Sequence, residues 1–495
     1  MGKVLTILEV SRKQGYIFAS KKLRENAERS QDIAYLTSST FFTEAVGEAY
    51  SDRNNLVSTG GGHATLQFDS REAAVDFTRR VTLAALETYP ELELFARTID
   101  YDPGLDPGDN LKALTSALEA KKARRTSSFR WLGLGVELPQ DVDSRPRPDS
   151  RKHARDIVPP PEGYAYFSQP DLETDDNFIA VVHIDGNNMG ARVGGLYQRY
   201  KGKTDSASWE SCRKDLQTFS KGIQADFETA FSKMAETLAR RTKQTKLLPL
   251  RPIILAGDDV CFVTAGSIGL ECARIFIKEL TTLTNKADGQ PYAACAGVAL
   301  VHQKYPFHRA YQLAEALCDN AKKYGADLDE QRRVSAMDWH IEFGQLKDSL
   351  FDLRQDYQTE DGCRLELRPV ALVLPPDPKG KILNVPERTY SFFYNMCRTM
   401  KDCNRTIARS KIKELRTALK QGEVEGRFFL HDKEISELLY HPLEIAYTQA
   451  EWAEKLQAKD AFQAFPAVNG TERRCLFFDA IDMIDHFTPF EEVAL

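Results

Sequence analysis

Short apolar runs and helical apolar spacings alternate along the second half of the chain. The runs predict buried strands: "NFIAVVHID" (177–185), "PIIL" (252–255), "VCFV" (260–263) and "YAACAGVALV" (292–301). Apolar residues at spacings of 3, 4 and 3 predict one buried face on each of two helices. They are Leu270, Ala273, Ile277 and Leu280, then Phe307, Ala310, Ala314 and Leu317. A longer helix is predicted over about 208–240.

The order of these elements predicts a fold class. Strand, helix, two strands, helix, strand and helix is the order of a ferredoxin-like domain. Such a domain has an antiparallel sheet, helices on one face and a central hairpin exposed at one end. The strand runs that precede and follow Asp258 and Asp259 are the two strands of that hairpin.

The first part of the chain repeats the order. The predicted strands are 3–10 and 92–98, the hairpin is "LVSTGGGHATLQF" (56–68), and the predicted helices are 21–42, 71–87 and 110–122. We interpret this as an internal duplication of one fold. Laying Gly62 on Gly257 puts His63 and Ala64 in the places of Asp258 and Asp259. The first copy then has no hairpin carboxylates, and we expect it to be a structural partner or a substrate-binding half.

Composition shifts divide the chain into four predicted parts. The first copy takes residues 1–140, and 141–175 is a linker rich in proline and charge, because it contains "SRPRPDSRKHARDIVPPPEG". The second copy takes 176–345. Residues 346–495 contain "RTYSFFYNMCRTM", "RSKIKELRTALKQG" and "EISELLYHPLEIAY", which predict a mostly helical C-terminal domain. The expected fold class is therefore α+β, with two tandem ferredoxin-like domains and a helical domain.

Charge and cysteine usage narrow the class of protein. The formal net charge of −6 over 495 residues argues against a surface that coats nucleic acid. The basic runs "KKARR", "ARRTKQTK" and "RTIARSKIKELR" favour solvated helix faces, with an RNA track as the alternative. Nine scattered cysteines without a CxxC pair favour the reducing cytoplasm. No apolar run is long enough for a membrane helix, and "MGKVLT" is more typical of a first strand than of a leader or a lipidation signal.

Three carboxylates lie at strand ends of the second copy. Asp185 ends the first strand, and Asp258 and Asp259 occupy the hairpin tip. The first strand of a ferredoxin-like sheet lies beside the hairpin, so the three side chains are expected at one edge. Their mutual repulsion favours a divalent cation, Mg²⁺ or Mn²⁺. Mg²⁺ held by one or two carboxylates and substrate phosphates suits nucleotidyl transfer.

The neighbouring residues suggest where phosphates bind. Gly186 lets the chain turn after Asp185 and exposes a carbonyl to the metal, and Gly190 lies at a predicted helix start that favours phosphate. Lys322 and Lys304 are candidate phosphate ligands. Each feature also has a plain structural explanation. A lone "GDD" is a turn, Asp185 is a helix cap, and Lys322 is a cation near a helix C-terminus.

These motifs resemble a known family. "VVHIDGNNMG", "LAGDDVCFV" and "AGVALVHQKYPFHRAYQLAEALCDNAKKYG" are similar to the catalytic palm of the large polymerase-like subunit of type III CRISPR effector complexes, which is related to GGDEF nucleotidyl cyclases. "LEVSRKQGYIFASKKLREN" and "STGGGHATLQF" resemble its degenerate first palm, and "SAMDWHIEF" resembles a later segment. The resemblance covers most of the chain, and the motifs of the second palm are the specific ones.

The resemblance implies an activity and a site. Family members condense ATP into cyclic oligoadenylate messengers in antiphage defence, with nucleotides between the two palms. The metal-binding aspartates map to Asp185, Asp258 and Asp259. The turns that follow the strands, with the two lysines, become the nucleotide-binding set of Gly186, Asn187, Asn188, Gly190, Gly257, Lys304 and Lys322.

The chain departs from the family pattern in four ways. It starts directly with the first palm, without the usual HD nuclease domain, and a proline-rich linker replaces the zinc ribbon. Ala256 replaces the first glycine of the usual pair before the aspartates, and Asn187 stands where a second aspartate is common. We therefore expect a shortened form that works alone or within a CRISPR complex.

Two hypotheses of different classes follow, with a weaker third. The first is a cytoplasmic, metal-dependent nucleotidyltransferase that makes a cyclic nucleotide from NTPs, with ATP the expected substrate and a messenger-activated effector downstream. The second is a scaffold subunit, non-catalytic or RNA-activated, that binds RNA and other CRISPR effector subunits. The third is a nucleotide hydrolase similar to GTP cyclohydrolase. The sequence leaves open the base, the ring size, the linkage, the activator and the oligomeric state.

Overall fold

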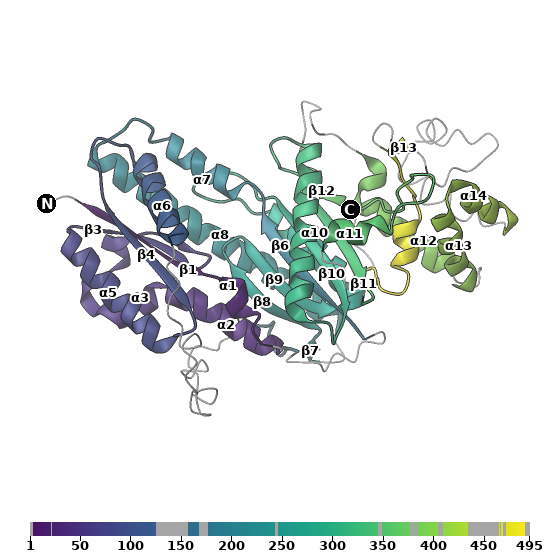
Figure 1. Ribbon diagram of the computed structural model, residues 1–495, viewed down its shortest axis with the longest axis horizontal. Coiled ribbons are helices and arrows are strands. Elements are labelled where there is room, and N and C mark those ends of the chain that lie inside the picture. Colours follow the sequence, from purple (N-terminus) through teal and green to yellow (C-terminus); the bar gives the residue numbers. More distant parts are fainter. Residues whose placement is uncertain are drawn as a thin grey trace.

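The structure is a computed structural model. It describes residues 3–20, 22–124, 157–167, 177–242, 246–344, 349–376, 382, 385–403, 409–433, 465, 467–468 and 472–490. Figure 1 shows two sheets with their helices side by side, the first repeat in purple and blue and the second in teal and green, with further helices beyond the second. Strand and helix are mixed throughout, so the predicted α+β class is confirmed.

The first repeat has the ferredoxin-like strand order. Its sheet runs β2-β3-β1-β4, and every neighbouring pair is antiparallel. The strands are β1 (Val4–Ser11), β2 (Leu56–Gly60), β3 (His63–Phe68) and β4 (Glu93–Asp100), and the main helices are α2 (Leu23–Leu36), α5 (Arg71–Thr88) and α6 (Pro107–Ala123).

One predicted helix of the first repeat is divided into two. The pattern over 21–42 predicted continuous helix, whereas α2 ends at Leu36 and α3 (Ser39–Val46) begins after a break. Ser38 causes the restart, because its side chain accepts a hydrogen bond from the backbone N–H of Phe41 at 3.2 Å. Three short helical segments complete this region, α1 (Lys13–Ile17), η1 (Gly47–Ala49) and α4 (Asp52–Asn55).

The second repeat has the same core and a wider sheet. Its order is β12-β11-β10-β6-β9-β8, in which β10-β6-β9-β8 matches β4-β1-β3-β2 of the first repeat. The core strands are β6 (Phe178–Gly186), β8 (Leu250–Ala256), β9 (Asp259–Ala265) and β10 (Ala294–His302). The helices are α7 (Met189–Gln198), α8 (Ser206–Arg241), α9 (Gly269–Thr281) and α10 (Phe307–Leu328). Two strands extend the sheet, β11 (Ser335–Glu342), parallel to β10, and β12 (Val370–Val373), antiparallel to β11.

Close packing fixes α10 on the sheet. A Cβ at Gly297 on β10 would overlap the carbonyl oxygen of Ala314 and the amide nitrogen of Cys318. Glycine at this position therefore lets the helix backbone approach the strand. The helix also continues past Gly325 to Leu328, so that glycine lies within the helix rather than after its end.

The two repeats cover each other's sheet edges. Helix α8 of the second repeat packs on the edge strand β2, where Arg213 donates to the carbonyl oxygen of Leu56 at 2.9 Å. Helix α2 of the first repeat packs in the same way on the edge strand β8 (Figure 1). The repeats are therefore related by an approximate twofold exchange of their first long helices, and both sheet edges at the interface are protected.

The two hairpins correspond in a register one residue away from the predicted one. Glu9 pairs with His63 as Asp185 pairs with Asp259, and Gly60 pairs with His63 as Ala256 pairs with Asp259. Each turn thus has two central residues, Gly61–Gly62 in the first repeat and Gly257–Asp258 in the second. His63 therefore takes the place of Asp259 and Gly62 that of Asp258, which corrects the assignment of His63 and Ala64.

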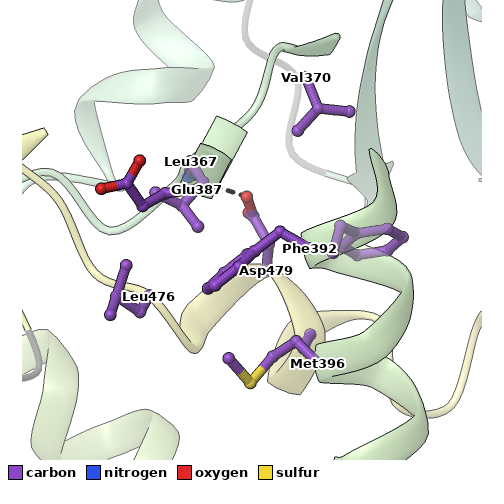
Figure 2. Close-up of a pocket in the computed structure, with 9 residues that line it drawn as sticks. Leu367, Val370, Glu387, Phe392, Met396, Leu476 and Asp479 are labelled. Atoms are coloured by element: carbon purple, nitrogen blue, oxygen red, sulfur yellow. Dashed lines mark hydrogen bonds between the residues drawn. The ribbon is translucent and has the colours of Figure 1, made fainter. Parts of the chain in front are cut away.

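The region that follows the second repeat packs against its sheet. The helices α12 (Tyr390–Cys403) and α17 (Phe478–Asp482) contact each other, and α12 also contacts β12. Figure 2 shows the small cavity between them, about 10 Å³, in which the backbone N–H of Leu367 donates to Asp479 at 2.8 Å. This volume holds at most one water, so the cavity is a packing defect of the core.

The remaining predictions concern helices, the linker and membranes. Helices α13 (Arg409–Gln421) and α14 (Glu423–Asp432) lie in the predicted helical region, as does the short α11 (Leu350–Gln355). The predicted helix "EISELLYHPLEIAY" and most of the linker lie outside the described residues. Across the described ranges, no helix has the length and apolar character needed to span a membrane.

Candidate active site

The backbone brings Asp185, Asp258 and Asp259 to one edge of the second sheet. Asp185 and Asp259 are directly opposed on the antiparallel strands β6 and β9. Their side chains therefore leave the same face of the sheet, with Cβ atoms about 5 Å apart. Asp258 lies at the turn between β8 and β9, and its carbonyl oxygen accepts a hydrogen bond from the backbone N–H of Gly186 at 3.2 Å. The predicted convergence of the three residues is thus present in the backbone.

Glycines make this convergence possible. A Cβ at Gly186 would lie 3.0 Å from the Cβ of Asp258 and would collide with Met189, so a side chain there would push the turns apart. Gly257 has a φ of 70°, which a residue with a side chain rarely adopts. It stands first in the two-residue turn, where a type II′ hairpin requires glycine. Its N–H donates to Gln224 on α8 at 2.7 Å, which fixes the turn to the helix.

The carboxyl groups repel one another in a partly desolvated place. Burial raises the pKa of Asp258 to about 6, together with the charge of Asp185 and a proton shared with it. Burial raises the pKa of Asp259 to about 7, and the charges of Asp185 and Asp258 add to the shift. The Asp259 side chain is still 47% exposed, so solvent screens part of this effect. The cluster therefore holds protons near neutral pH.

Lys322 faces the same carboxylates from helix α10. Its ammonium lies 2.5 Å from Oδ2 of Asp185, and both side chains are about one-third exposed. Burial acts to lower the pKa of Lys322, but the charge of Asp185 and the hydrogen bond to it raise the pKa overall. The predicted lysine at the end of the last helix is therefore in contact with the cluster.

The donor set fits a divalent cation in its chemistry. Asp185 and Asp258 are close enough to share a proton, and the buried Oδ1 of Asp259 has no hydrogen-bond partner among the described residues. A bound cation would offset the repulsion between Asp185 and Asp258 and would give Oδ1 of Asp259 a partner. Nevertheless, the described residues contain no ready-made group of three His, Cys, Asp or Glu ligands. Two carboxylates with substrate phosphates are the Mg²⁺ ligand set that this arrangement favours.

The side chain of Asn187 has a structural role. Its buried amide nitrogen donates to the carbonyl oxygens of Val334 at 2.9 Å and Arg332 at 3.2 Å, which ties the turn after β6 to the segment before β11. A carboxylate could only accept hydrogen bonds and would face two carbonyl oxygens. This explains why asparagine, rather than a second aspartate, suits this position.

The other predicted turn residues surround the start of α7. Asn188 adopts a left-handed conformation with a φ of 62° directly before α7, and its side chain donates to the carbonyl oxygen of Gln331. Gly190 is the second residue of α7, as predicted, and a Cβ there would meet nothing within 4 Å. Both residues lie three to five positions after Asp185 and therefore near the cluster.

Lys304 lies at the wrong end of the sheet for its predicted role. Cys295 on β10 pairs with Asp185, whereas His302 at the far end of the strand pairs with Phe178. The two pairs are seven positions apart along β10, a distance of about 24 Å at ~3.4 Å per residue. Lys304 follows His302, so the prediction that it binds substrate phosphate is wrong.

Sequence reasoning missed a histidine and an acidic residue at the site. Nδ1 of His183 lies 3.5 Å from Oδ1 of Asp259 without hydrogen-bond geometry, and burial lowers the pKa of this imidazole to about 4. Glu315 on α10 contributes negative charge at Asp259. A signal was available, because His183 precedes Asp185 by two and shares its strand face. Glu315 lies seven residues before Lys322, which places both on one helix face.

The first repeat keeps part of the site. Glu9 occupies the position of Asp185, and Lys122 on α6 lies 2.9 Å from it, as Lys322 lies beside Asp185. Lys122 follows Phe95, the partner of Glu9 on β4, by 27 residues, and Lys322 follows Cys295, the partner of Asp185, by 27 as well. The hairpin carboxylates are absent, as predicted, but one carboxylate–lysine pair remains.

Comparison with known proteins assigns the second repeat. Residues 178–329 match the family model described as Cas10/Cmr2, second palm domain. This range includes Asp185, Asp258, Asp259 and Lys322. The second repeat is thus a palm of the Cas10/Cmr2 kind, which confirms the resemblance over these residues. A search of curated proteins finds no significant match.

Solved structures share the fold at low identity. A chain of the Csm1–Csm4 cassette in complex with cA4 matches with a TM-score of 0.51 and 12% identity, over 98% of this chain and 69% of that chain. The cassette in complex with cA3 matches with a TM-score of 0.44 and 12% identity, over 66% of this chain and 53% of that chain. The cassette in complex with one ATP matches with a TM-score of 0.44 and 13% identity, over 66% of this chain and 54% of that chain. The chain thus spans about half the length of several of these neighbours.

Proposed function

We propose that this protein is a metal-dependent nucleotidyltransferase that joins NTPs, with ATP the expected substrate, into a cyclic nucleotide or oligonucleotide messenger in antiphage defence. The observation that carries the proposal is the meeting of Asp185, Asp258 and Asp259 at one sheet edge, with Lys322 in contact. The match to the Cas10/Cmr2 second palm covers all four residues. The similar cassette solved in complex with cA4 supports the same class of product.

Each residue has a role that its position permits. Asp185 and Asp258 would hold Mg²⁺ or Mn²⁺, with the carbonyl of Gly186 beside them. The bound metal would stabilise the charge on the attacking hydroxyl and the leaving pyrophosphate. Asp259 would assist in metal binding or accept the proton of the 3′-hydroxyl, because its pKa of about 7 suits a base near neutral pH. Lys322 would leave Asp185 and bind substrate phosphate.

The surrounding turns would receive the nucleotide. The backbone N–H groups at the start of α7, near Asn188 and Gly190, favour phosphate because the helix N-terminus is partly positive. Asn187 would hold this turn in place through its bonds to the segment before β11. Gly186 and Gly257 would allow the substrate to approach the backbone.

The test is product analysis by mass spectrometry. Purified protein is incubated with mixed NTPs and Mg²⁺ or Mn²⁺, beside the double variant Asp258→Ala/Asp259→Ala and a control variant Asp76→Ala, whose exposed side chain lies on α5. The proposal expects a cyclic product from wild type and control and none from the double variant. Product from a folded double variant would exclude these aspartates as the catalytic residues.

One observation favours a second function. The described residues include no assembled three-ligand metal group, and Lys322 already neutralises Asp185. A site in this state fits a subunit that RNA must activate, or a scaffold of a CRISPR ribonucleoprotein. RNA that copurifies with the protein, and product formed only when RNA is added, would favour this alternative over a stand-alone synthase.

A further inference from the structure

Lys13 of the first repeat reaches the tip of its own hairpin. It begins α1, directly after Arg12, which turns the chain with a φ of 54°. Its ammonium donates to the carbonyl oxygen of Gly61. A Cβ at Gly62 would lie 3.1 Å from Cε and 3.4 Å from Nζ of Lys13, so the glycine turn makes room for this side chain.

That hairpin tip touches the catalytic turn of the second repeat. A Cβ at Gly61 would lie 3.9 Å from the carbonyl oxygen of Ala256, and a Cβ at Gly257 would lie 4.0 Å from the amide nitrogen of Gly61. The two turns therefore meet backbone to backbone. The ammonium of Lys13 is thereby brought near the carboxylate of Asp259, and the two charges affect each other's ionisation.

The ammonium of Lys13 has few hydrogen-bond and charge partners for a partly buried cation. Glu9, the carboxylate of its own repeat that influences it most, is held by Lys122 at 2.9 Å. Among the described residues no carboxylate lies within 4.0 Å of the Lys13 ammonium, and Gly61 is its one hydrogen-bond acceptor. An ammonium has three donors. A half-buried cation with unused donors gains most from a multiply charged anion.

The segment that carries Lys13 is anchored on the second repeat. Gln14 donates to Glu315 on α10 at 2.8 Å, and the ring of Phe18 contacts those of Tyr311 and Phe307 at 4.4 and 5.4 Å. These contacts hold α1 on the helix that also carries Lys322. The two lysines thus approach the aspartates from different repeats.

We propose that Lys13 binds the polyphosphate of the nucleotide held at Asp185, Asp258 and Asp259, so that the first repeat supplies a residue to the catalytic site of the second. The inference rests on the proposed function. It assigns the first repeat a direct role in substrate binding through one side chain. Lys322 of the second repeat and Lys13 of the first would then both contact phosphate groups, and two cations favour a triphosphate over a monophosphate.

The experiment is calorimetric titration of the full chain with a non-hydrolysable ATP analogue, and separately with AMP, both with Mg²⁺. The variants are Lys13→Met, which keeps the length but removes the charge, and Lys13→Arg, which keeps a cation. The matched control is Lys22→Met, a nearby lysine that is 66% exposed and pairs with Glu25. Thermal unfolding identifies any variant that fails to fold.

The proposal expects Lys13→Met to weaken binding of the triphosphate analogue about tenfold or more, while binding of AMP changes little. Lys13→Arg should recover most of the affinity, and Lys22→Met should match wild type. Equal affinity of wild type and folded Lys13→Met for the analogue would overturn the inference and leave the proposed function intact. Lack of analogue binding by wild type, or equal binding by Asp258→Ala/Asp259→Ala, would overturn both.

Discussion

The ammonium of Lys322 lies 2.5 Å from Oδ2 of Asp185, so a cation from helix α10 already neutralises the first aspartate of the cluster. A bound metal and a substrate phosphate would divide this pair, since the metal would take the carboxylate and the phosphate the ammonium. The pair therefore gives the resting site a defined charge arrangement before substrate arrives.

Lys322→Met tests the role of that ammonium. We expect KM for NTP to rise about tenfold, because a charged hydrogen bond to phosphate is lost. Thermal stability should change little, because an ion pair this exposed contributes at most about 1 kcal/mol. Steady-state kinetics and a melting curve check both points. Lys323→Met, at the exposed neighbouring position, is the control, and an equal rise in KM for both variants would contradict the assignment.

The aspartate pair predicts a pH dependence with a definite sign. The pKa values of Asp258 and Asp259 are raised to about 6 and 7, so the folded protein binds these protons more tightly than the unfolded chain. Between about pH 4 and 7 the folded state therefore holds more protons, and stability falls as pH rises. Mn²⁺ binding needs the ionised forms, so metal affinity should rise over the same range.

The measurement compares melting temperatures at pH 5 and pH 8, with EDTA and with Mn²⁺. In EDTA, Asp258→Asn/Asp259→Asn should lose part of the pH-dependent decrease, on the order of 1–3 °C. Added Mn²⁺ should stabilise wild type more at pH 8 than at pH 5 and should not stabilise the double variant. Identical pH profiles for wild type and variant would show that these groups do not titrate as described.

Asn187→Asp should destabilise the fold. The change replaces two N–H donors by acceptors that face the carbonyl oxygens of Arg332 and Val334 in a buried place. The expected loss is about 2–3 kcal/mol in the free energy of unfolding, which urea denaturation measures. Asn188→Asp, at a more exposed neighbour, should cost clearly less, and equal losses would argue against the role of the Asn187 amide.

Gly297→Ala should separate α10 from the sheet. The added methyl group would overlap backbone atoms of Ala314 and Cys318, which cannot rotate away. We expect a loss of about 1–3 kcal/mol or more, together with reduced NTP binding, because α10 carries Lys322. Gly195→Ala in α7 is the control, since a Cβ there meets nothing within 4 Å and alanine favours helix. A fully stable Gly297→Ala protein would contradict the close approach.

The sequence pattern predicted much of the fold, because apolar runs and helical spacings report burial directly. The duplication was visible in the order of elements, and Asp185 and Asp259 could be paired because β6 and β9 are neighbours in a ferredoxin-like sheet. The break in helix 21–42 was missed because the cap of Ser38 outweighs a helical pattern that continues on both sides. Hydrophobic periodicity shows which face of a helix is buried, but it does not show where a capping side chain ends one helix and starts the next.

The site was predicted less completely than the fold. Lys304 was misplaced because a motif match carries no information on which end of β10 a residue lies, whereas the strand register does. Lys13 was missed because its position depends on a contact between two turns that are almost 200 residues apart in the chain. The hairpin register was one residue off because both turns contain glycines that can be aligned in more than one way.

The exchange of helices α2 and α8 between the repeats has consequences for the evolution of this protein and for its expression in fragments. Each repeat, produced separately, would present a bare sheet edge and an uncovered helix face, β2 with α2 in one case and β8 with α8 in the other. Neither half is therefore a sound expression fragment. Because one chain always supplies both repeats in equal number, each repeat could diverge while still packing against the other. The aspartates could therefore remain in one repeat while the other specialised.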